Sequence, residues 1–181
     1  QIEPHFLFNT LAHVRALVGR DARAAQGMID SLIDYLRASS RNMALTLVTL
    51  DDEIASVRGY LAVMQLRLGA RLRVAWQVPA EAGEVAIPPA ALQTLVENAI
   101  KHGIEPASQG GEIRIEARRA GAGWEVDVIN TGAAFGDAGP ARGDRGGTGL
   151  ANLRERLRLT LGAQATLTLE SLPEGTRVRL H

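Results

Sequence analysis

The stretch LDDEIASVRGYLAVMQLRLGARLRVAWQV (residues 50–78) contains the change of hydrophobic period that decides the fold. Apolar residues first recur at helical spacing, as on a packed seam, at Leu50, Ile54, Val57, Leu61, Met64 and Leu68. Thr49 is a suitable N-cap for this helix, and Gly69 is a natural stop. Beyond the glycine, apolar residues alternate as in a half-buried strand, at Leu72, Val74, Trp76 and Val78.

The residues that precede this stretch are also predicted to be helical. Apolar side chains recur at helical spacing at Ile2, Phe6, Val14 and Leu17, and again between Met28 and Leu36. We interpret VGRDAR (18–23) as a kink within this longer helical pattern. Because two helices bury little apolar surface by themselves, the regular seam of residues 50–68 predicts a partner, which a homodimeric four-helix bundle would supply.

The residues that follow Gly69 are predicted to form a mixed sheet covered by helices. Strand-like alternation recurs in residues 113–117, 124–128, 165–169 and 178–180. Two helix-like stretches, at about 88–102 and about 148–161, lie among these strands. Helices interspersed among strands that are mostly joined by hairpins predict an α+β fold with the helices on one face of the sheet.

The composition excludes several classes of function. The chain has 181 residues, enough for one large or two small domains. Lys and Arg number 20, as do Asp and Glu, so we expect no direct nucleic-acid partner. Without cysteine there is no disulfide framework, thiolate metal site or catalytic thiol. No apolar run is long enough to span a membrane, but the chain opens at Gln1 inside a motif, and we expect the parent protein to continue upstream.

The motif QIEPHFLFN (1–9) contains one potential nucleophile. His5 could act as a nucleophile near neutral pH, and Pro4 before it suits the first turn of a helix. Phe6, Leu7 and Phe8 give it an apolar surround. The alternative is a histidine near a helix start that only packs or is solvated.

The motif LVENAIKHG (95–103) places Glu97, Asn98, Lys101 and His102 within about one and a half turns of a helix. Asn98 and Lys101 are an i, i+3 pair and would project together. An amide oxygen can ligate Mg²⁺, and a lysine one turn away can neutralise phosphate oxygens. The alternative is an amphipathic helix with a solvated polar face.

Two strand positions supply further polar groups. In VDVINTG (126–132) the strand ends at Asn130, and an amide there could pair with a base edge while the backbone at Gly132 comes close. In PEGTRVRL (173–180), Thr176 could face a pocket from the final strand. The alternatives are an ordinary Asn/Gly turn and a strand threonine without function.

The motif GGTGLANLRERL (146–157) leads glycine-rich backbone directly into an apolar helix. Free N–H groups at a helix N-terminus make an anion site, although the motif matches neither standard glycine pattern for nucleotides. The segment 131–149 has no apolar periodicity, and a loop of that length inside a compact domain is usually functional or mobile. The alternatives are a flexible linker with a helix cap, and a surface insertion.

In this order, QIEPHFLFNTL, LVENAIKHG, NTG, GGTGLANLRERL and EGT closely resemble the H, N, G1 and G2 boxes and final strand of LytS-type sensor histidine kinases. LIDYLRASS (32–40), VTLDDEIASVRGYLAVMQLRLG (48–69) and IPPAALQTLVENA (87–99) are similar to the same family. The resemblance spans nearly the whole chain. It implies that residues 1–70 form dimerising phosphoacceptor helices, and that residues 71–181 form an ATP-binding domain of the GHKL (Bergerat) type, a two-layer α/β sandwich.

By this resemblance the chain would be a protein histidine kinase that uses ATP and Mg²⁺. His5 would be the phosphoacceptor, and Glu97 would orient or activate a nucleophile. Asn98 would ligate Mg²⁺, and Lys101 and His102 would contact phosphate. The adenine pocket and the glycine box that closes over the phosphates would include Asn130, Gly132, Thr176, Gly147, Thr148, Gly149 and Leu150.

One residue of the site departs from the family pattern. The first glycine box usually begins with aspartate, whose carboxylate accepts a hydrogen bond from the adenine amino group, and here that position is Asn130. Because an amide also donates, we predict weaker ATP affinity and poorer discrimination against guanine. Residues 133–146 would be the ATP lid, and GAAFG (132–136) is poorer in glycine than the usual box, so we expect the hinge of the lid to differ.

The resemblance also implies partners and a location. His5 would pass its phosphoryl group to an aspartate in the receiver domain of a response regulator, of the LytTR type or similar, and helices 1–70 would form a homodimer. The chain would be a cytoplasmic domain of a parent protein anchored in the bacterial inner membrane through an upstream sensor region. Two alternatives stay open. One is a kinase-deficient, nucleotide-binding scaffold or phosphatase-biased member, and the other is a GHKL-type ATPase with Glu97 as base.

Overall fold

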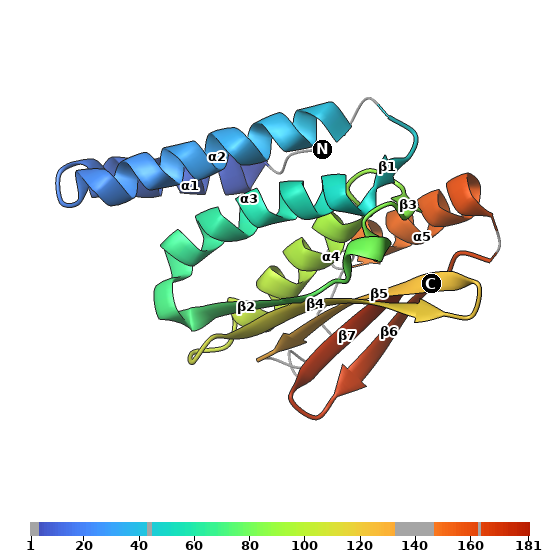
Figure 1. Cartoon of the computed structure of the whole chain (residues 1–181). Coiled ribbons are helices and arrows are strands. Elements are labelled where there is room, and N and C mark those ends of the chain that lie inside the picture. Colours follow the sequence, from blue (N-terminus) through green and yellow to red (C-terminus); the bar gives the residue numbers. More distant parts are fainter. Residues whose placement is uncertain (1–3, 43–44, 133–146, 163) are drawn as a thin grey trace.

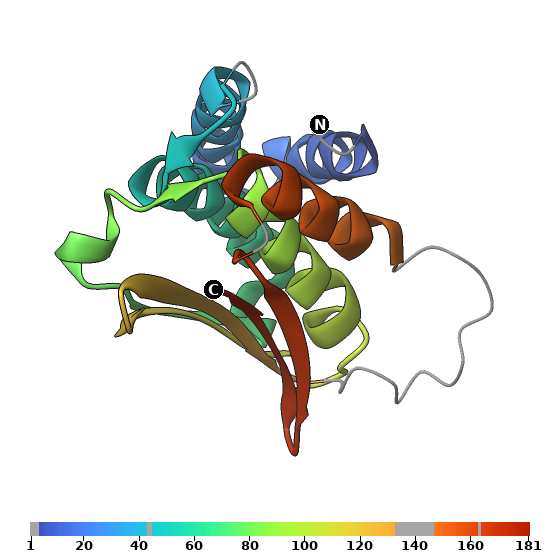
Figure 2. The same cartoon turned by 90° about the vertical axis from the view of Figure 1, so that its right-hand side faces the viewer.

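The chain forms three layers, two of helices and one of strands (Figure 1). The computed structural model describes residues 4–42, 45–132, 147–162 and 164–181. The helices are α1 (Pro4–Val18), α2 (Ala22–Asn42), α3 (Leu50–Leu68), α4 (Ala91–Asn98) and α5 (Gly147–Leu161). Helices α1 and α2 form the outer layer, and α3, α4 and α5 lie between them and the sheet (Figure 2).

The sheet has five strands in the order β2-β4-β5-β7-β6. Its strands are β2 (Leu72–Gln77), β4 (Gly111–Ala120), β5 (Gly123–Thr131), β6 (Leu167–Leu172) and β7 (Gly175–Leu180). Only the β2–β4 pair is parallel among these neighbours, because a helical crossover joins those two strands. The predicted α+β fold, with helices on one face of a mixed sheet, is confirmed.

Short elements connect the layers. Strands β1 (Val48–Thr49) and β3 (Ala86–Ile87) pair with each other, outside the main sheet. Two 3-10 turns, η1 (Gly69–Arg71) and η2 (Ala80–Ala82), flank β2, and a π-helical segment, η3 (Ala99–Ile104), extends α4. No helix in the described ranges is long and apolar enough to cross a membrane.

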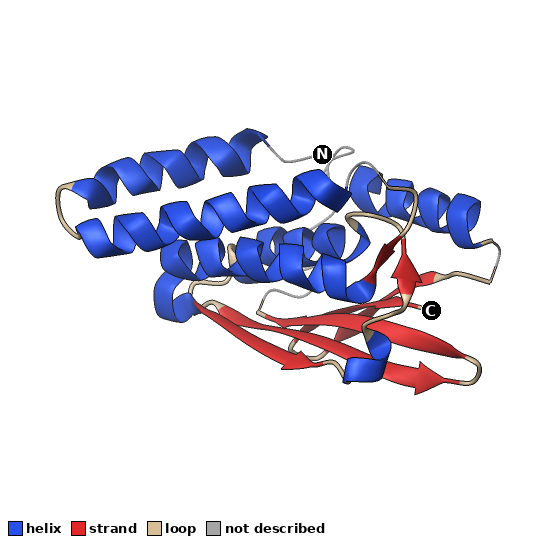
Figure 3. Cartoon of the chain, turned by 45° about the horizontal axis from the view of Figure 1, so that its top comes forward, coloured by secondary structure: helices blue, strands red, loops and turns tan. Residues whose placement is uncertain are grey.

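The segment 18–23 reverses the chain, so the predicted kink within one long helix is wrong. The backbone N–H groups of Arg20 and Asp21 both donate to the Leu17 carbonyl at 2.8 Å, which closes a tight turn. The Asp21 carboxylate then accepts from the Ala24 N–H at 2.9 Å and so caps the next helix. As a result α1 and α2 form a hairpin, seen from above in Figure 3.

Helix α3 begins and ends where its sequence predicts. Thr49 and Asp52 form a capping box, in which the Thr49 hydroxyl accepts from the Asp52 N–H and the Asp52 carboxylate accepts from the Thr49 N–H. At the other end Gly69 has a φ of +59°, a left-handed conformation that favours glycine.

Helix α3 is buried on two sides within a single chain. Its predicted seam is filled by the chain itself, since Leu50, Ile54, Val57, Leu61 and Met64 are all at most 8% exposed. A second buried row consists of Glu53, Ser56, Tyr60 and Val63. The argument that the seam of 50–68 requires a second chain is therefore wrong, and a dimer needs a different apolar face.

The second row brings α2 close to α3. The Ser39 and Ser56 hydroxyls lie 3.0 Å apart, and a β-carbon at Gly59 would lie only 3.0 Å from the Tyr35 Cα. The rings of Phe6 from α1, Tyr35 from α2 and Tyr60 from α3 form one cluster, with centroids 4.9 to 5.8 Å apart. The three helices therefore share an aromatic core.

Helix α3 also contacts the remainder of the chain, on the side away from α2. It packs against α4 and β2, and the Arg58 guanidinium lies 4.3 Å from the centre of the Trp76 ring. The predicted boundary between residues 70 and 71 thus falls just after a helix that both predicted parts share.

The core beneath α5 gives a direct test of the helix packing. Replacing Leu153, which is fully buried, with alanine should lower the free energy of unfolding by about 2–5 kcal/mol, because it removes apolar contacts and leaves a cavity. Leu159→Ala on the same helix is the matched control. Leu159 is 69% exposed, and its loss should change stability by less than about 0.5 kcal/mol. Urea unfolding of both variants makes the comparison, and equal effects would contradict the observed face of α5.

Candidate functional site

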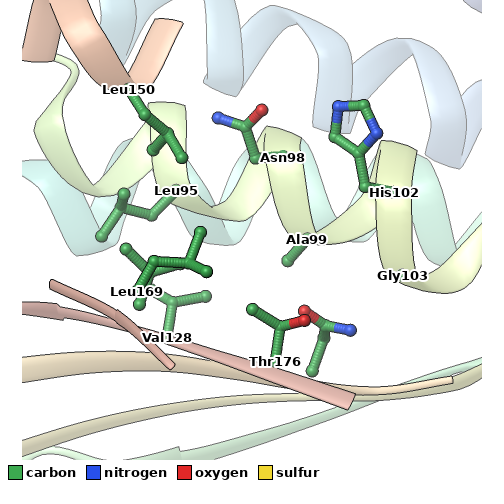
Figure 4. Close-up of a pocket in the computed structure, with 11 residues that line it drawn as sticks. Leu95, Asn98, Ala99, His102, Gly103, Val128, Leu150, Leu169 and Thr176 are labelled. Carbon is green, nitrogen blue, oxygen red and sulfur yellow. The ribbon is translucent and has the colours of Figure 1, made fainter. Parts of the chain in front are cut away.

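A pocket with about 350 Å³ of empty space, part of it open to solvent, lies between the α4–η3 helix and strands β5, β6 and β7 (Figure 4). Its wall is mostly apolar and carries a few polar side chains. The lining residues are Leu95, Asn98, Ala99, His102, Gly103, Val128, Asn130, Leu150, Leu169, Thr176 and Val178. An apolar pocket with a few convergent polar groups is typical of a small-molecule site.

The pocket brings together predicted site residues from separate motifs. Asn98 and His102 come from the helix, Asn130 and Thr176 from neighbouring strands, and Leu150 from the first turns of α5. Asn130 and Thr176 are direct partners in the β5–β7 pairing. Residues almost 80 positions apart therefore share one cavity.

Asn98 presents its amide oxygen for a ligand. Its Nδ2 donates to the Thr94 carbonyl, one turn earlier, at 2.8 Å. That bond orients the amide and leaves Oδ1 as the hard oxygen donor that Mg²⁺ prefers. The start of α5 is close by, since a β-carbon at Gly149 would lie 3.8 Å from Asn98 Nδ2.

The π-helical segment η3 follows Asn98 and contains Lys101 and His102. Here the Glu105 N–H donates to the Ile100 carbonyl, an i→i+5 bond of 2.9 Å. In this segment His102 lies in the pocket wall and Lys101 is exposed outside it. The expectation that Asn98 and Lys101 project together assumed an α-helix, and the structure does not bring them together.

The surroundings of His102 disfavour its charged form. Burial lowers the pKa of its imidazole, the positive charge of Lys101 lowers it further, and Glu105 opposes the shift. Folding therefore favours the neutral ring, and this contribution to stability is lost as the pH falls through the ordinary histidine range. In the pocket His102 offers a hydrogen-bonding group rather than a charge.

Asn130 is a buried amide with an unused donor. The residue is 6% exposed, and within the described part of the chain its Nδ2 has no hydrogen-bond partner. Glycine at position 103 makes room for it, because a β-carbon there would overlap the Asn130 amide. Leaving such a donor unmet is costly, so the site favours a ligand with an acceptor at this point.

Glycine is also required at Gly132, directly after β5. Its φ is +118°, and a β-carbon there would overlap the Gly103 carbonyl. Gly132 does not line the pocket, but it allows the end of β5 to approach η3 closely.

Several predicted site residues lie outside the pocket wall. His5 is exposed on α1, with Asn9 Nδ2 3.2 Å from its Nε2. Glu97 is half-buried and accepts a hydrogen bond of 2.7 Å from Gln93 Nε2. Gly147 and Thr148 begin α5. The predicted lid, 133–146, lies outside the described residues.

Sequence reasoning missed two groups of residues at this site. The apolar wall, including Val128 and Leu169, has the pattern of ordinary core strands and gives no separate signal. Gln93 is buried and bonded to Glu97, and its position one helical turn before the glutamate could have revealed the pair.

Two family models match the chain, and together they cover most of it. One, described as histidine kinase, matches residues 1–72. The other, described as histidine kinase-, DNA gyrase B- and HSP90-like ATPase, matches residues 89–181. The second match contains α4, the pocket and the last four strands of the sheet.

Curated relatives match the chain over its whole length. The sensor histidine kinase BtsS of Escherichia coli strain K12 is 32% identical over 182 residues, which cover 100% of this chain and 32% of BtsS. The sensor histidine kinase/phosphatase LytS of Staphylococcus aureus strain Mu50 is 31% identical over 188 residues, which cover 97% of this chain and 32% of LytS. The chain thus spans about a third of the length of these relatives.

A solved structure supports the fold. The histidine kinase AdeS of Acinetobacter baumannii superposes with a TM-score of 0.53 and 14% identity, covering 92% of this chain and 81% of that one. Sequence and structure therefore lead to one assignment. The chain belongs to the histidine kinase-, DNA gyrase B- and HSP90-like ATPase family.

Proposed function

We propose that this chain is the catalytic region of a sensor histidine kinase, which binds ATP in the pocket and transfers its γ-phosphoryl group to His5. One observation carries the proposal. The pocket joins Asn98, Asn130 and Thr176, three polar residues from separate family motifs, around a mostly apolar wall.

The adenine ring would occupy the part of the pocket beside the sheet. Val128, Leu169 and Ala99 offer an apolar surface for a flat ring, and Asn130 and Thr176 offer polar atoms at its edge. The unused donor of Asn130 suits a ring nitrogen or another acceptor of a purine. Gly132 supports this end of the pocket by letting the strand and helix approach.

The phosphates would lie towards Asn98 and the start of α5. The first N–H groups of α5, in the glycine box Gly147 to Leu150, would bind phosphate oxygens at the helix N-terminus. Asn98 Oδ1 fits a magnesium ligand, and the ion would neutralise phosphate oxygens. Lys101 would reach the phosphates along its flexible side chain, and His102 would donate a hydrogen bond to them.

Transfer to His5 requires positioning and charge neutralisation more than covalent assistance from the protein. The imidazole lone pair would attack the γ-phosphorus, a nitrogen–phosphorus bond would form, and ADP would leave with the bridging oxygen. His5 is exposed on α1, which suits a group that must meet two different reactants in turn. Glu97 would orient the imidazole, with Gln93 holding its carboxylate.

The second reactant would be a receiver domain of a response regulator, of the LytTR type or similar. Its aspartate would take the phosphoryl group from His5. The parent protein would be anchored in the bacterial inner membrane through a sensor region, with this part in the cytoplasm. Residues 1–70 would form the dimerising and phosphoacceptor part, and residues 71–181 the ATP-binding part, with α3 in contact with both.

The outer helices offer a face for a second copy of the chain. Large apolar side chains are exposed on α1 and α2, at Phe8, Leu11, Val18, Ile29 and Ile33. Pairing two hairpins through these residues would make a four-helix bundle and cover the apolar groups. This face replaces the seam of 50–68, which is buried inside the chain.

A second candidate function is a nucleotide-binding scaffold or a phosphatase-biased kinase. Asn130 favours it, because an amide at this position lacks the acceptor-only carboxylate that the family pattern has. The S. aureus relative is itself described as a kinase and phosphatase. A simple GHKL-type ATPase is less well supported, since such an enzyme needs no histidine-bearing helix pair.

Autophosphorylation tests the main proposal. With γ-labelled ATP and Mg²⁺, the wild-type protein should acquire acid-labile label. His5→Gln should lose the label and keep nucleotide binding, and Asn98→Ala should lose most of both. His13→Gln, a change of the same type on the same helix, should keep the label. Label that persists in His5→Gln would exclude His5 as the acceptor. An unlabelled wild type that still binds nucleotide would support the scaffold.

Nucleotide specificity tests the role of Asn130. Asn130→Asp should bind ATP about fivefold more tightly and discriminate better against GTP, because a charged acceptor strengthens a hydrogen bond by about 1 kcal/mol. Asn152→Asp, on the exposed side of α5, should change neither property. Competition of ATP and GTP for the site measures both. Tight wild-type binding with strict adenine preference would contradict the predicted effect of the amide.

The concentration dependence of molar mass tests the dimer face. Leu11→Glu places a charge on the exposed apolar face of α1, and should raise the dimer dissociation constant at least tenfold in sedimentation experiments. Leu159→Glu, at another exposed leucine on α5, should leave it unchanged. Equal effects of the two variants would show that the dimer, if formed, uses another surface.

A further inference from the structure

Glu53 is a buried acid that none of the steps above uses. It lies on α3, is 1% exposed, and directs its carboxylate at the start of α4. Oε1 accepts from the Ala90 N–H at 2.8 Å, and Oε2 accepts from the N–H groups of Leu92 and Gln93 at 3.1 and 3.4 Å. Both carboxylate oxygens therefore bind backbone of the helix that carries the nucleotide-site motif.

The start of α4 depends on this outside acceptor. Its N-cap residue is Ala90, which has no side-chain oxygen to accept from the first N–H groups. Pro88 and Pro89 come directly before it and supply no such oxygen either. Glu53 thus provides from α3 the cap that the local sequence lacks, with a negative charge at the positive end of the helix dipole.

The backbone at this point is held in a strained conformation. Ala90 has a φ of +58°, the left-handed region, and is the only non-glycine residue with positive φ in the described ranges. The Ala90 N–H donates to Glu53. The Ala90 carbonyl accepts from the Thr94 N–H at 3.1 Å and from the Thr94 hydroxyl at 2.6 Å. Such strain persists only where the surroundings over-determine it.

Two hydrogen bonds connect the start of α4, where Glu53 binds, to the site residues Glu97 and Asn98. Gln93, whose N–H is bound by Glu53, donates its side-chain amide to Glu97 at 2.7 Å. Thr94, which folds back onto Ala90, accepts through its carbonyl from the Asn98 amide at 2.8 Å. The α-helical part is only eight residues long, so the clamp and the site are about two turns apart.

We propose that Glu53 is a positioning residue for the nucleotide site, acting through residues 90–94 on the orientation of Glu97 and Asn98. This proposal rests on the proposed function, because it gives those two residues their roles. Glutamate is required rather than glutamine, since an amide would turn an N–H donor towards backbone N–H groups.

The test compares Glu53→Gln with Asp127→Asn. Asp127 is an equally buried carboxylate, 3% exposed and bonded through both oxygens to Arg179 at 2.7 and 2.9 Å. It adjoins Val128, which lines the pocket, and so points to the opposite face of the sheet. Both changes should lower stability. The autophosphorylation rate is measured at saturating ATP and at a temperature where both variants are folded. Only Glu53→Gln should lower this rate, by at least tenfold.

A second variant separates positioning from stability. Ala90→Gly removes the backbone strain, because glycine adopts positive φ freely. The double variant Glu53→Gln/Ala90→Gly should recover much of the lost thermal stability without recovering the rate. A rate that returns with stability would overturn the positioning role, as would equal rate losses in Glu53→Gln and Asp127→Asn.

Hydrogen exchange keeps the test independent of kinase activity. Glu53→Gln should speed the exchange of amides in residues 91–98 at least tenfold relative to those of β4, and Asp127→Asn should not. A wild-type protein that acquires no phosphoryl label would refute the proposed function but not the role of Glu53. Amide exchange in α4 would then decide that role. If Glu53→Gln leaves the exchange of residues 91–98 unchanged, the positioning role is overturned.

Discussion

The burial of α3 on two sides is the constraint on which the rest of the structure depends. Ser56, Gly59 and Tyr60 pack against α2, and Glu53, about one turn before Ser56, reaches the start of α4. Since protein interiors are close-packed, such a helix cannot slide without separating from one neighbour or the other. The layer that carries His5 and the layer that carries the pocket are therefore fastened to one shared element.

The fold is predictable where hydrophobic period and local chemistry agree. The change of period at Gly69, the Thr49 cap and the alternating strands all follow from short-range physics, and all are present. The second buried row of α3 escapes such reasoning, because Glu53 and Ser56 are polar residues whose partners are distant in sequence. The reversal at Arg20 and Asp21 was also missed, since it contains no proline and its glycine also suits a kink.

The site is predictable in its motif residues and not in its geometry. Asn98, Asn130 and Thr176 come together as their motifs suggest, because strand pairing and the crossover bring those segments to one cavity. The exposed position of Lys101 could not be foreseen, since a π-turn depends on tertiary packing around it. The capping of α4 by Glu53 could not be predicted either, because the acceptor lies 37 residues before Ala90 in the sequence.

In the π-helical segment, the number of residues after Asn98 determines whether a charged or an uncharged side chain lies in the pocket wall. A turn closed by i→i+5 bonds holds one more residue than an α-turn does. One more residue between Asn98 and Lys101 would put the lysine at the position, four residues after Asn98, that His102 now occupies. A charged side chain would then stand in the pocket wall, where the imidazole now lies. Chain length, without any change of side chain near Asn98, thus sets the electrostatic character of this wall.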